Sequence, residues 1–489
     1  MSPSSDSPTT TSGGSTTSSS ARVIAPLVFG GLTYAVAQTT IVPVVPQIQA
    51  ATGADAGDVT WVITGFFVSS AALTVVAGRL GDLFGKKPVL LAVLALFGVG
   101  SVVAAVGGSL GAVVAGRVIM GTAGGVFPLS FAILGQHLPR DRAAFGMGLI
   151  SSMFGLGGAL GLPVGGLVAD HLGYQGLFWG TAGMTVVSLV GIAVFVPGTL
   201  GSGSGRVDWG GALLLAASLG GMLTAISKGA DWGWASAPVL GLFGAGVLAL
   251  VVLVLVEQRI RDPLIDLALM RRRNVWVANL TACLVTVGQA TSFLLIPQVV
   301  QMPAEGGVGL GVGVSQAGLF MLPAAIATML AGPLTGRAVA RFGMRPPLVV
   351  GAVATAAGLV VLAAGGAQPV AILVGAAVMG IGGGTAFAVL PMLISEAVPV
   401  RDLGAANGVN TIVRHISMAV AAQVAAAVLV LGTPAGELYP VRGAFVADFG
   451  VSALLGVLAL LLVPLVRARP DRAAEESAPH PAEAEKTRC

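Results

Sequence analysis

Charged side chains are scarce in this chain. Asp, Glu, Lys and Arg make up 9% of its 489 residues, against about 25% in soluble domains. Hydrophobic residues make up 55%, which is more apolar surface than a soluble fold can bury. Because a lipid layer offers backbone polar groups no water, such a chain crosses the membrane either as helices or as a closed barrel.

Cysteine and histidine are also rare. Cys283 lies within an apolar run and Cys489 is the last residue, so the sequence contains no disulfide framework. The four histidines show no metal-ligand spacing, and we expect neither a metal site nor a cofactor. Paired acids and a nucleophile with a base are lacking as well, which argues against an enzyme.

Two further motifs are absent. The phosphate loop G-x-x-x-x-G-K-[ST] does not occur, which excludes an ATP-driven pump. The basic residues lie in short loops rather than on one face, so we do not expect nucleic-acid binding.

What the chain has instead is continuous apolar runs of about 20 residues, the length that a helix needs to cross a bilayer. A barrel would show alternating segments of about ten residues. The 72 glycines suit close packing of membrane helices. We expect 14 transmembrane helices, at 23–46, 60–80, 88–107, 110–134, 144–168, 175–197, 209–228, 237–256, 275–300, 314–336, 347–365, 368–394, 404–430 and 443–466.

The basic residues indicate the orientation. Arg117 and Arg414 lie inside spans, Lys228 and Arg442 lie in odd-to-even loops, and all other Lys and Arg residues lie in the tails or the even-to-odd loops. Basic loops stay in the cytoplasm. Both termini are therefore expected there, with 1–22 and 467–489 as disordered tails.

A repeat divides the chain. The stretch 78–90, GRLGDLFGKKPVL, returns at 336–348 as GRAVARFGMRPPL. Span 4 matches span 12 through Met120, Gly121, Gly124 and Gly125, which correspond to Met379, Gly380, Gly383 and Gly384. We therefore expect two six-helix bundles, at 23–200 and 273–466, with two inserted helices and a connector at 201–272. Transporters built from repeats bind substrate between the repeats at the bilayer midplane.

These features resemble the major facilitator superfamily, and within it the 14-span drug:proton antiporters. The resemblance is carried by the loop at 78–90, by WVITGFFVSSAALTVVAGRLGD just before it, and by VDWGGALLLAASLGGMLTAISKGADWGW at the inserted pair. It implies an exporter of a hydrophobic small molecule (antibiotic, drug or secondary metabolite) across the cytoplasmic membrane, driven by proton antiport. The alternatives are an uptake or facilitated-diffusion transporter and a non-transporting receptor or enzyme. We expect a monomer.

The loop at 78–90 combines glycines with one acid among bases. Asp82 can pair with its basic neighbours, or its carboxylate can face the N-terminus of a helix in the other half, which the family resemblance places near Leu403. The family resemblance favours the second arrangement, a conformational latch that opens when the halves rock. Its residues are Gly78, Arg79, Asp82, Gly85, Lys86 and Lys87. The second copy has Ala340 in place of the acid.

Two arginines lie at membrane depth, where a charge must face a cavity or a partner. Arg117 resembles the arginine that the family links to proton transfer, and the other interpretation is a structural arginine held by backbone carbonyls. Arg414 is either structural or cavity-lining. Its neighbour His415 is interpreted as a packing residue rather than a proton site.

Span 5 contains GLGGALGLPVGGLVAD, which resembles the antiporter signature with its proline shifted by one position. Glycines four residues apart share one helix face, where another helix can approach, and proline kinks a helix. The expected hinge comprises Gly157, Gly161, Pro163, Gly165 and Gly166. Mere close packing is the alternative interpretation.

Span 1 has Gln38 where the 14-span group commonly has an aspartate. No span centre holds an obvious carboxylate, and Asp448 is the deepest acid and hence a candidate for proton coupling. A buried cation needs a counter-charge, so a neutral or anionic hydrophobic substrate fits better than a cationic drug. Gln38, Gln289 and Gln298 are cavity candidates; Gln289 and Gln298 could equally bridge helices.

Overall fold

The computed structural model describes residues 15–54, 56–199, 201, 208–260, 263–304, 309–399, 402–434 and 439–466. Within these ranges every regular element is a helix. The expected tail at 467–489 lies outside the described residues, as do residues 1–14 of the expected tail at 1–22. The first helix starts at Ser15 rather than at 23, so residues 15–22 of the expected disordered tail are helical.

The N-terminal bundle follows the expected order, with short helical pieces at its loops. Its elements are α1 (Ser15–Thr39), η1 (Val42–Val44), α2 (Val45–Thr52), α3 (Ala56–Val59), α4 (Trp61–Phe84), α5 (Lys86–Val106), α6 (Leu110–Met120), η2 (Gly121–Gly125), α7 (Val126–His137) and α8 (Arg140–Phe195). Spans 5 and 6 together form α8. Gly173 divides its two arms, with a φ of 68° that glycine adopts without strain.

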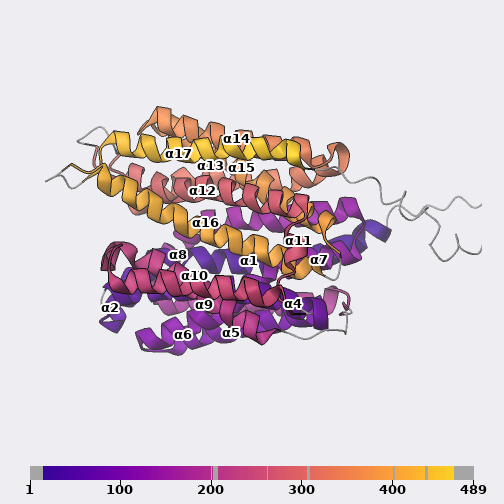
Figure 1. Cartoon of the computed structure of the whole chain (residues 1–489). Helices are drawn as coiled ribbons and strands as arrows, with labels where there is room; N and C mark the ends of the chain where they lie inside the picture. Colours follow the sequence, from indigo (N-terminus) through magenta and orange to yellow (C-terminus); the bar gives the residue numbers. More distant parts are fainter. Residues whose placement is uncertain are drawn as a thin grey trace, which may run out of the picture.

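The inserted pair and the C-terminal bundle complete the chain. The inserted pair is α9 (Trp209–Trp232) and α10 (Ala237–Glu257), and the connector carries α11 (Leu267–Met270). The C-terminal bundle is α12 (Arg273–Gln301), α13 (Val314–Phe342), α14 (Arg345–Gly365), α15 (Pro369–Ala397), α16 (Leu403–Leu431), α17 (Arg442–Leu462) and η4 (Val463–Leu465). In Figure 1 the helices of this bundle form the upper layer, and α4, α5, α6, α9 and α10 lie in the lower one.

Thirteen of the described helical segments are long and apolar enough to cross a membrane. The expected span at 144–168 is the first arm of α8. It is not among the thirteen, and it includes Ala159, Leu162 and Pro163, whose side chains lie outside the described part of the chain. The other thirteen expected spans each coincide with a counted segment.

The sequence repeat is also a repeat of helix packing. In the N-terminal bundle α5 crosses α6 where Gly100 meets Gly116, and a Cβ on Gly100 would lie 2.6 Å from the Gly116 oxygen. At the matching crossing of α14 and α15, Gly358 meets Gly375, and a Cβ on Gly358 would lie 2.9 Å from the Gly375 oxygen. Small residues permit such backbone contact between membrane helices. One difference is that span 4 is broken by the 3-10 turn η2, whereas α15 is continuous.

The inserted pair lies against the interface of the two bundles. Leu215 and Leu219 of α9 join one apolar cluster with Val75 of α4 and Ile412 of α16. Leu264 of the connector belongs to the same cluster and is buried. The insertion therefore contacts both halves.

Both ends of the described chain lie at the same end of the bundle (Figure 1). Near the N-terminus, Ser20 accepts a hydrogen bond of 2.7 Å from Arg142, at the start of α8. Near the C-terminus, the backbone oxygen of Val466 accepts two hydrogen bonds from the side chain of Arg345, at the start of α14. We use the name cytoplasmic end for this basic end, following the expected orientation.

Candidate transport site and latch

The carboxylate of Asp82 lies at the N-terminus of α16. Its Oδ1 accepts a hydrogen bond of 3.4 Å from the backbone N–H of Gly404, and its Oδ2 accepts one of 3.3 Å from Ala405. A helix N-terminus carries free N–H groups and partial positive charge, which suit an anion. Asp82 is 3% exposed. An acid of the first half is thus joined to a helix of the second half.

Asp82 also pairs with its own loop. Lys86 Nζ lies 3.2 Å from Asp82 Oδ1, one helical turn away, and Lys86 is buried too. Both sequence interpretations of the acid therefore occur together. Because Asp82 and Lys86 belong to the same half, only the contact with α16 joins the two halves.

The remaining loop residues have distinct contacts. Lys87 donates from Nζ to the Ala193 oxygen at 2.9 Å and from its backbone N–H to Thr199 at 2.7 Å, which ties the loop to the end of α8. Gly85 turns the chain with a φ of 96°, and its counterpart in the repeat, Gly343, has a φ of 77°. Both positions need glycine for this conformation.

Glycines bring α4 and α16 into backbone contact beside the acid. A Cβ on Gly78 would lie 2.5 Å from the carbonyl carbon of Gly404, and one on Gly408 would lie 3.2 Å from the Cα of Val75. These distances leave no room for a side chain at Gly78. We call Asp82, Gly78, Gly404 and Ala405 the cytoplasmic latch.

A second contact between the halves joins α8 to α13. A Cβ on Gly336 would lie 2.7 Å from the Ala144 oxygen, and the guanidinium of Arg337 lies 4.8 Å from the centre of the Phe145 ring. Beside them, the exposed Arg140 forms an ion pair with Glu396 of α15. The two halves are therefore in contact along their cytoplasmic ends.

The connector borders the latch. Arg79, the remaining latch-loop residue, lines a pocket of about 300 Å³ together with Asp266 and Leu269 of the connector and Asp402 before α16. Glu257, at the end of α10, accepts hydrogen bonds from the backbone of Leu264 and Ile265 and so fixes the connector. This pocket lies at the rim of the latch rather than between the bundle centres.

A cluster of rings, which we call the aromatic cluster, lies in the N-terminal bundle and reaches the C-terminal bundle through Phe387. Its members are Tyr34, Phe66, Phe127, Phe154 and Phe387. Phe127 stacks on Phe154 with 4.1 Å between ring centres, and Phe154 of α8 lies 6.3 Å from Phe387 of α15. Such pairs stabilise by about 0.5–1.5 kcal/mol beyond their area. The cluster therefore bridges the two halves.

Arg414 lies at the end of this cluster. Its guanidinium carbon is 4.6 Å from the Phe154 ring and 4.1 Å from the Phe387 ring, and the residue is 7% exposed. Its Nε has no hydrogen-bond partner among the described residues. The structure thus places Arg414 between a ring of each half. His415 packs edge-on against Phe67 at 6.0 Å.

Arg117 lies at the other end of the cluster, 4.1 Å from the Phe66 ring. It donates to the Val62 oxygen at 3.0 Å and to the Ala37 oxygen, near the end of α1, at 3.4 Å. These contacts are those of the structural interpretation. Arg117 is fully buried, and its Nη2 has no partner in the described part of the chain.

The three glutamines lie in different surroundings. Gln38 is buried on α1, one turn from Tyr34 and so on the same face. Gln289 donates from Nε2 to the Met379 oxygen at 2.8 Å and thereby bridges α12 and α15. Gln298 is exposed. Gln38 therefore lies one helical turn from a ring of the aromatic cluster.

The span-5 glycines pack against α1 within one half. A Cβ on Gly157 would lie 2.6 Å from the Ala35 carbonyl carbon, and one on Gly165 would lie 2.6 Å from the Thr40 oxygen. A Cβ on Gly161 would likewise overlap Thr39. Gly166, expected on this face, is not on it. A Cβ there meets nothing within 4 Å, because position 166 lies about 100° further round the helix.

The expected hinge includes Pro163, and the side chain of this residue lies outside the part of the chain that the structure describes. The helix continues through this position, and the one non-helical backbone conformation within α8 is at Gly173.

Asp448 lies in α17, away from the aromatic cluster. It is 2% exposed, and its Oδ2 has no partner among the described residues. One turn further along, Ser452 hydrogen-bonds Thr291 of α12 at 3.0 Å. Asp448 is therefore a buried acid on the α12 side of its helix rather than between the two halves.

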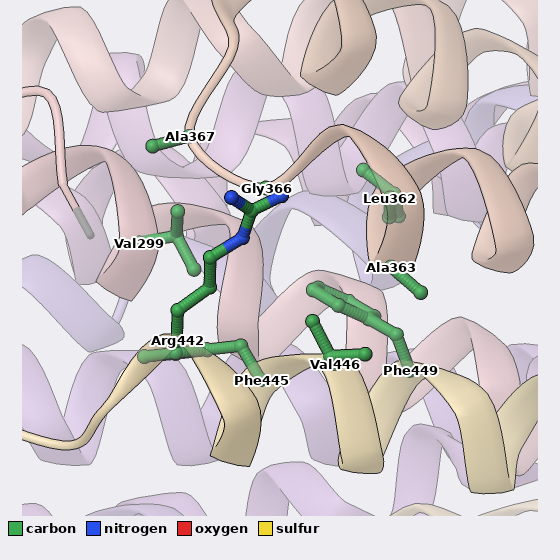
Figure 2. A pocket seen from close by; sticks show the side chains of 9 residues that line it. All are labelled: Val299, Leu362, Ala363, Gly366, Ala367, Arg442, Phe445, Val446 and Phe449. Atoms are coloured by element: carbon green, nitrogen blue, oxygen red, sulfur yellow. The ribbon is translucent and has the colours of Figure 1, made fainter. Parts of the chain in front are cut away.

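A second pocket, of about 270 Å³, lies at the opposite end of the C-terminal bundle (Figure 2). The side chain of Arg442 extends across it towards Gly366 and donates to the Ala364 oxygen at 3.3 Å. All of its lining residues belong to α12, α14, α17 and the loop after α14. The pocket therefore does not open onto the interface between the halves.

Sequence reasoning missed the rings of the site. Tyr34 lies four residues before Gln38, Phe154 three before Gly157, and Phe387 three after Gly384. Each lies one helical turn from a residue that the motifs had singled out, and aromatic residues are only 6% of the chain. That spacing was the available signal.

Comparison with known proteins places the chain in a family. The model of the Major Facilitator Superfamily matches residues 27–302 and again 278–487, two stretches that overlap at 278–302. The multidrug transporter protein MdtP of Bacillus subtilis is 23% identical over 73% of this chain and 66% of that protein. The tetracenomycin C resistance and export protein of Streptomyces glaucescens is 28% identical over 67% of this chain and 61% of that protein. The chain thus spans less than two thirds of the length of either relative.

Two further similarities complete the comparison. The uridine/deoxyuridine transporter of Lactococcus lactis is 28% identical over 67% of this chain and 69% of that protein. The crystal structure of the human organic anion transporter MFSD10 superposes with a TM-score of 0.64 at 18% identity, and covers 91% of this chain and 99% of that one. Fold, repeat and family match agree, and the chain belongs to the Major Facilitator Superfamily.

Proposed function

We propose that this protein exports a hydrophobic small molecule across the cytoplasmic membrane by alternating access coupled to proton antiport. The contact of Asp82 with the backbone of Gly404 and Ala405 carries the proposal, because it joins the two halves at one end by bonds that can open. Relatives named as a multidrug transporter and as an antibiotic resistance and export protein support export. The 14-span antiporter subgroup is part of the same proposal.

In this mechanism the cytoplasmic latch stabilises the state that is closed to the cytoplasm. Rocking of the halves separates Asp82 from α16 and exposes the aromatic cluster to the cytoplasm, where an apolar substrate enters. Closure restores the latch after the substrate has bound. Direct packing of the Gly78 and Gly404 backbones, which glycine alone permits, sets how closely the halves approach.

For proton coupling the contacts favour Asp448 over Arg117. Backbone carbonyls hold Arg117 in place, whereas the Asp448 carboxyl is buried and one of its oxygens lacks a partner in the described residues. The bond from Ser452 to Thr291 links α17 to α12, and Phe293 of α12 reaches α8 of the other half near Gly158, 3.6 Å from a Cβ built there. We expect Asp448→Asn to abolish substrate-induced proton movement while substrate exchange continues.

The alternative is an uptake or facilitated-diffusion transporter. The similarity to a uridine/deoxyuridine transporter favours it. The two functions differ in direction and in energy source, so one pair of measurements separates them.

The test is a drug-susceptibility panel in a pump-deficient host, together with proton-flux measurements in inverted membrane vesicles. Export predicts raised resistance to at least one hydrophobic compound, loss of that resistance with an uncoupler, and proton release from vesicles when the compound is added. Asp448→Asn, at equal membrane level, serves as the uncoupled control.

Accumulation of the compound in expressing cells would contradict export and support uptake. Efflux that is insensitive to the uncoupler would remove the antiport part of the proposal.

A further inference from the structure

We propose that Arg414, held between Phe154 and Phe387, binds the anionic group of an aromatic, amphipathic substrate. The inference rests on the proposed function, because it assigns a substrate class to the same site. An aryl carboxylate or aryl sulfonate has the required chemistry.

The first observation is that Arg414 is a buried cation without an anionic partner. It is 7% exposed, and its guanidinium contacts two ring faces, one from each half. Neither of the ion pairs found in the described residues includes it, and its Nε lacks a hydrogen-bond acceptor there. An intramembrane cation of this kind marks a ligand site, since it otherwise stays desolvated and unpaired.

The second observation is the charge of the surroundings. Arg117 lies at the other end of the aromatic cluster, and it too has no carboxylate partner among the described residues. Gln38, one turn from Tyr34, is neutral. Two uncompensated positive charges therefore flank the rings, which disfavours a cationic substrate and attracts an anionic one.

The geometry also indicates how the anion binds. A guanidinium is planar and offers paired N–H donors that match a carboxylate or sulfonate, while its faces stack on aromatic rings. Phe154 belongs to α8 and Phe387 to α15, so rocking of the halves draws the two rings apart. One face of Arg414 then becomes free, and the aromatic part of the substrate takes the place of the departing ring. His415, the next residue of α16, has an Nδ1 without a partner among the described residues.

The competing explanation is that Arg414 only pins the halves together through its two rings. A purely structural contact would affect the binding of every ligand alike, whereas an anion site distinguishes ligands by their charge. Two probes share one ring system and differ in charge: 8-anilinonaphthalene-1-sulfonate and N-phenyl-1-naphthylamine, which lacks the sulfonate.

The experiment measures equilibrium binding of both probes to the purified full-length protein in nanodiscs, with empty nanodiscs as the lipid background. We expect Arg414→Met to weaken binding of the sulfonate about tenfold or more, since a charge-assisted contact is lost. Binding of the neutral probe should change by less than about twofold. Arg414→Lys, which keeps the charge without the planar donors, should fall between.

Arg337→Met is the matched control, because it removes another arginine–ring contact between the halves, at the exposed end of α13. It should leave binding of both probes unchanged. An equal loss of binding of both probes in Arg414→Met would overturn the proposal and indicate that Arg414 only holds the two halves together. So would a wild-type protein that does not bind the sulfonate above the lipid background.

The anion site and the proposed export can be refuted independently of each other. Efflux of neutral compounds without sulfonate binding would refute the anion site and leave the exporter intact. Charge-selective binding at Arg414 without efflux would refute the exporter and support the site.

Discussion

Replacing Asp82 by asparagine tests the latch most directly. Asn is isosteric with Asp and keeps one oxygen as an acceptor, but it removes the negative charge at the N-terminus of α16. The pair with Lys86 is lost in both conformations, because both residues lie in the same half. The difference between the conformations therefore reports the contact with Gly404 and Ala405 alone.

The size of the effect follows from the geometry. A hydrogen bond to a charged group contributes about 1.5–3 kcal/mol when well formed. The two bonds here are 3.4 and 3.3 Å long, beyond the usual 2.9–3.0 Å, so each contributes less. Interaction of a carboxylate with a helix N-terminus reaches about 2 kcal/mol when partly buried. A loss of about 1–2 kcal/mol lowers the ratio of closed to open protein by about 5- to 30-fold.

The assay is the distance between the cytoplasmic ends of the two halves, measured by electron spin resonance. Phe84 and Phe342 are exposed, repeat-related positions at the ends of α4 and α13, and each can carry a spin label on an introduced cysteine. Cys283 and Cys489 are first replaced by alanine. Asp82→Asn should shift the distribution towards the longer distance and slow transport at equal membrane level.

Asp141→Asn is the matched control, because Asp141 is an exposed acid in the first turn of α8 on the same side. Its distances and transport should equal those of the wild type. A wild-type distance distribution and rate in Asp82→Asn would refute the latch. Gly78→Ala, which forces a Cβ against the Gly404 backbone, should open the same end without changing any charge.

Three other substitutions have defined outcomes. Gln38→Asp should widen export to lipophilic cations, since it adds a carboxylate beside the aromatic cluster, and an unchanged cation-resistance profile would count against this. Gly161→Val should destabilise the N-terminal bundle by about 1–3 kcal/mol through overlap with Thr39, seen as a lower melting temperature in detergent. Arg140→Ala should alter the closed population by less than about fivefold, because its ion pair with Glu396 is exposed, and the spin-label distances check this.

The loop at 78–90 shows what local pattern can predict. The turn glycine at 85, the repeat at 343 and the helix N-terminus near 404 that faces Asp82 all occur in the structure where the sequence places them. Motif and composition suffice here because each feature depends on a few neighbouring residues and on the family pattern. The span-5 glycines also lie on one helix face, as their four-residue spacing predicts, with the exception of Gly166.

The amino-acid sequence by itself determined the membrane environment, the helices and the repeated packing of the two halves, and the family pattern placed Asp82 opposite a helix N-terminus. Hydropathy, basic loops and repeats are properties of consecutive residues, and lipid forces such residues into helices. Only the tertiary structure decided that Arg414 lies between Phe154 and Phe387, and that Arg117 is held by α1 and α4. The physical reason is that these partners come from helices far apart in sequence, and the packing of the two halves sets which side chain meets which.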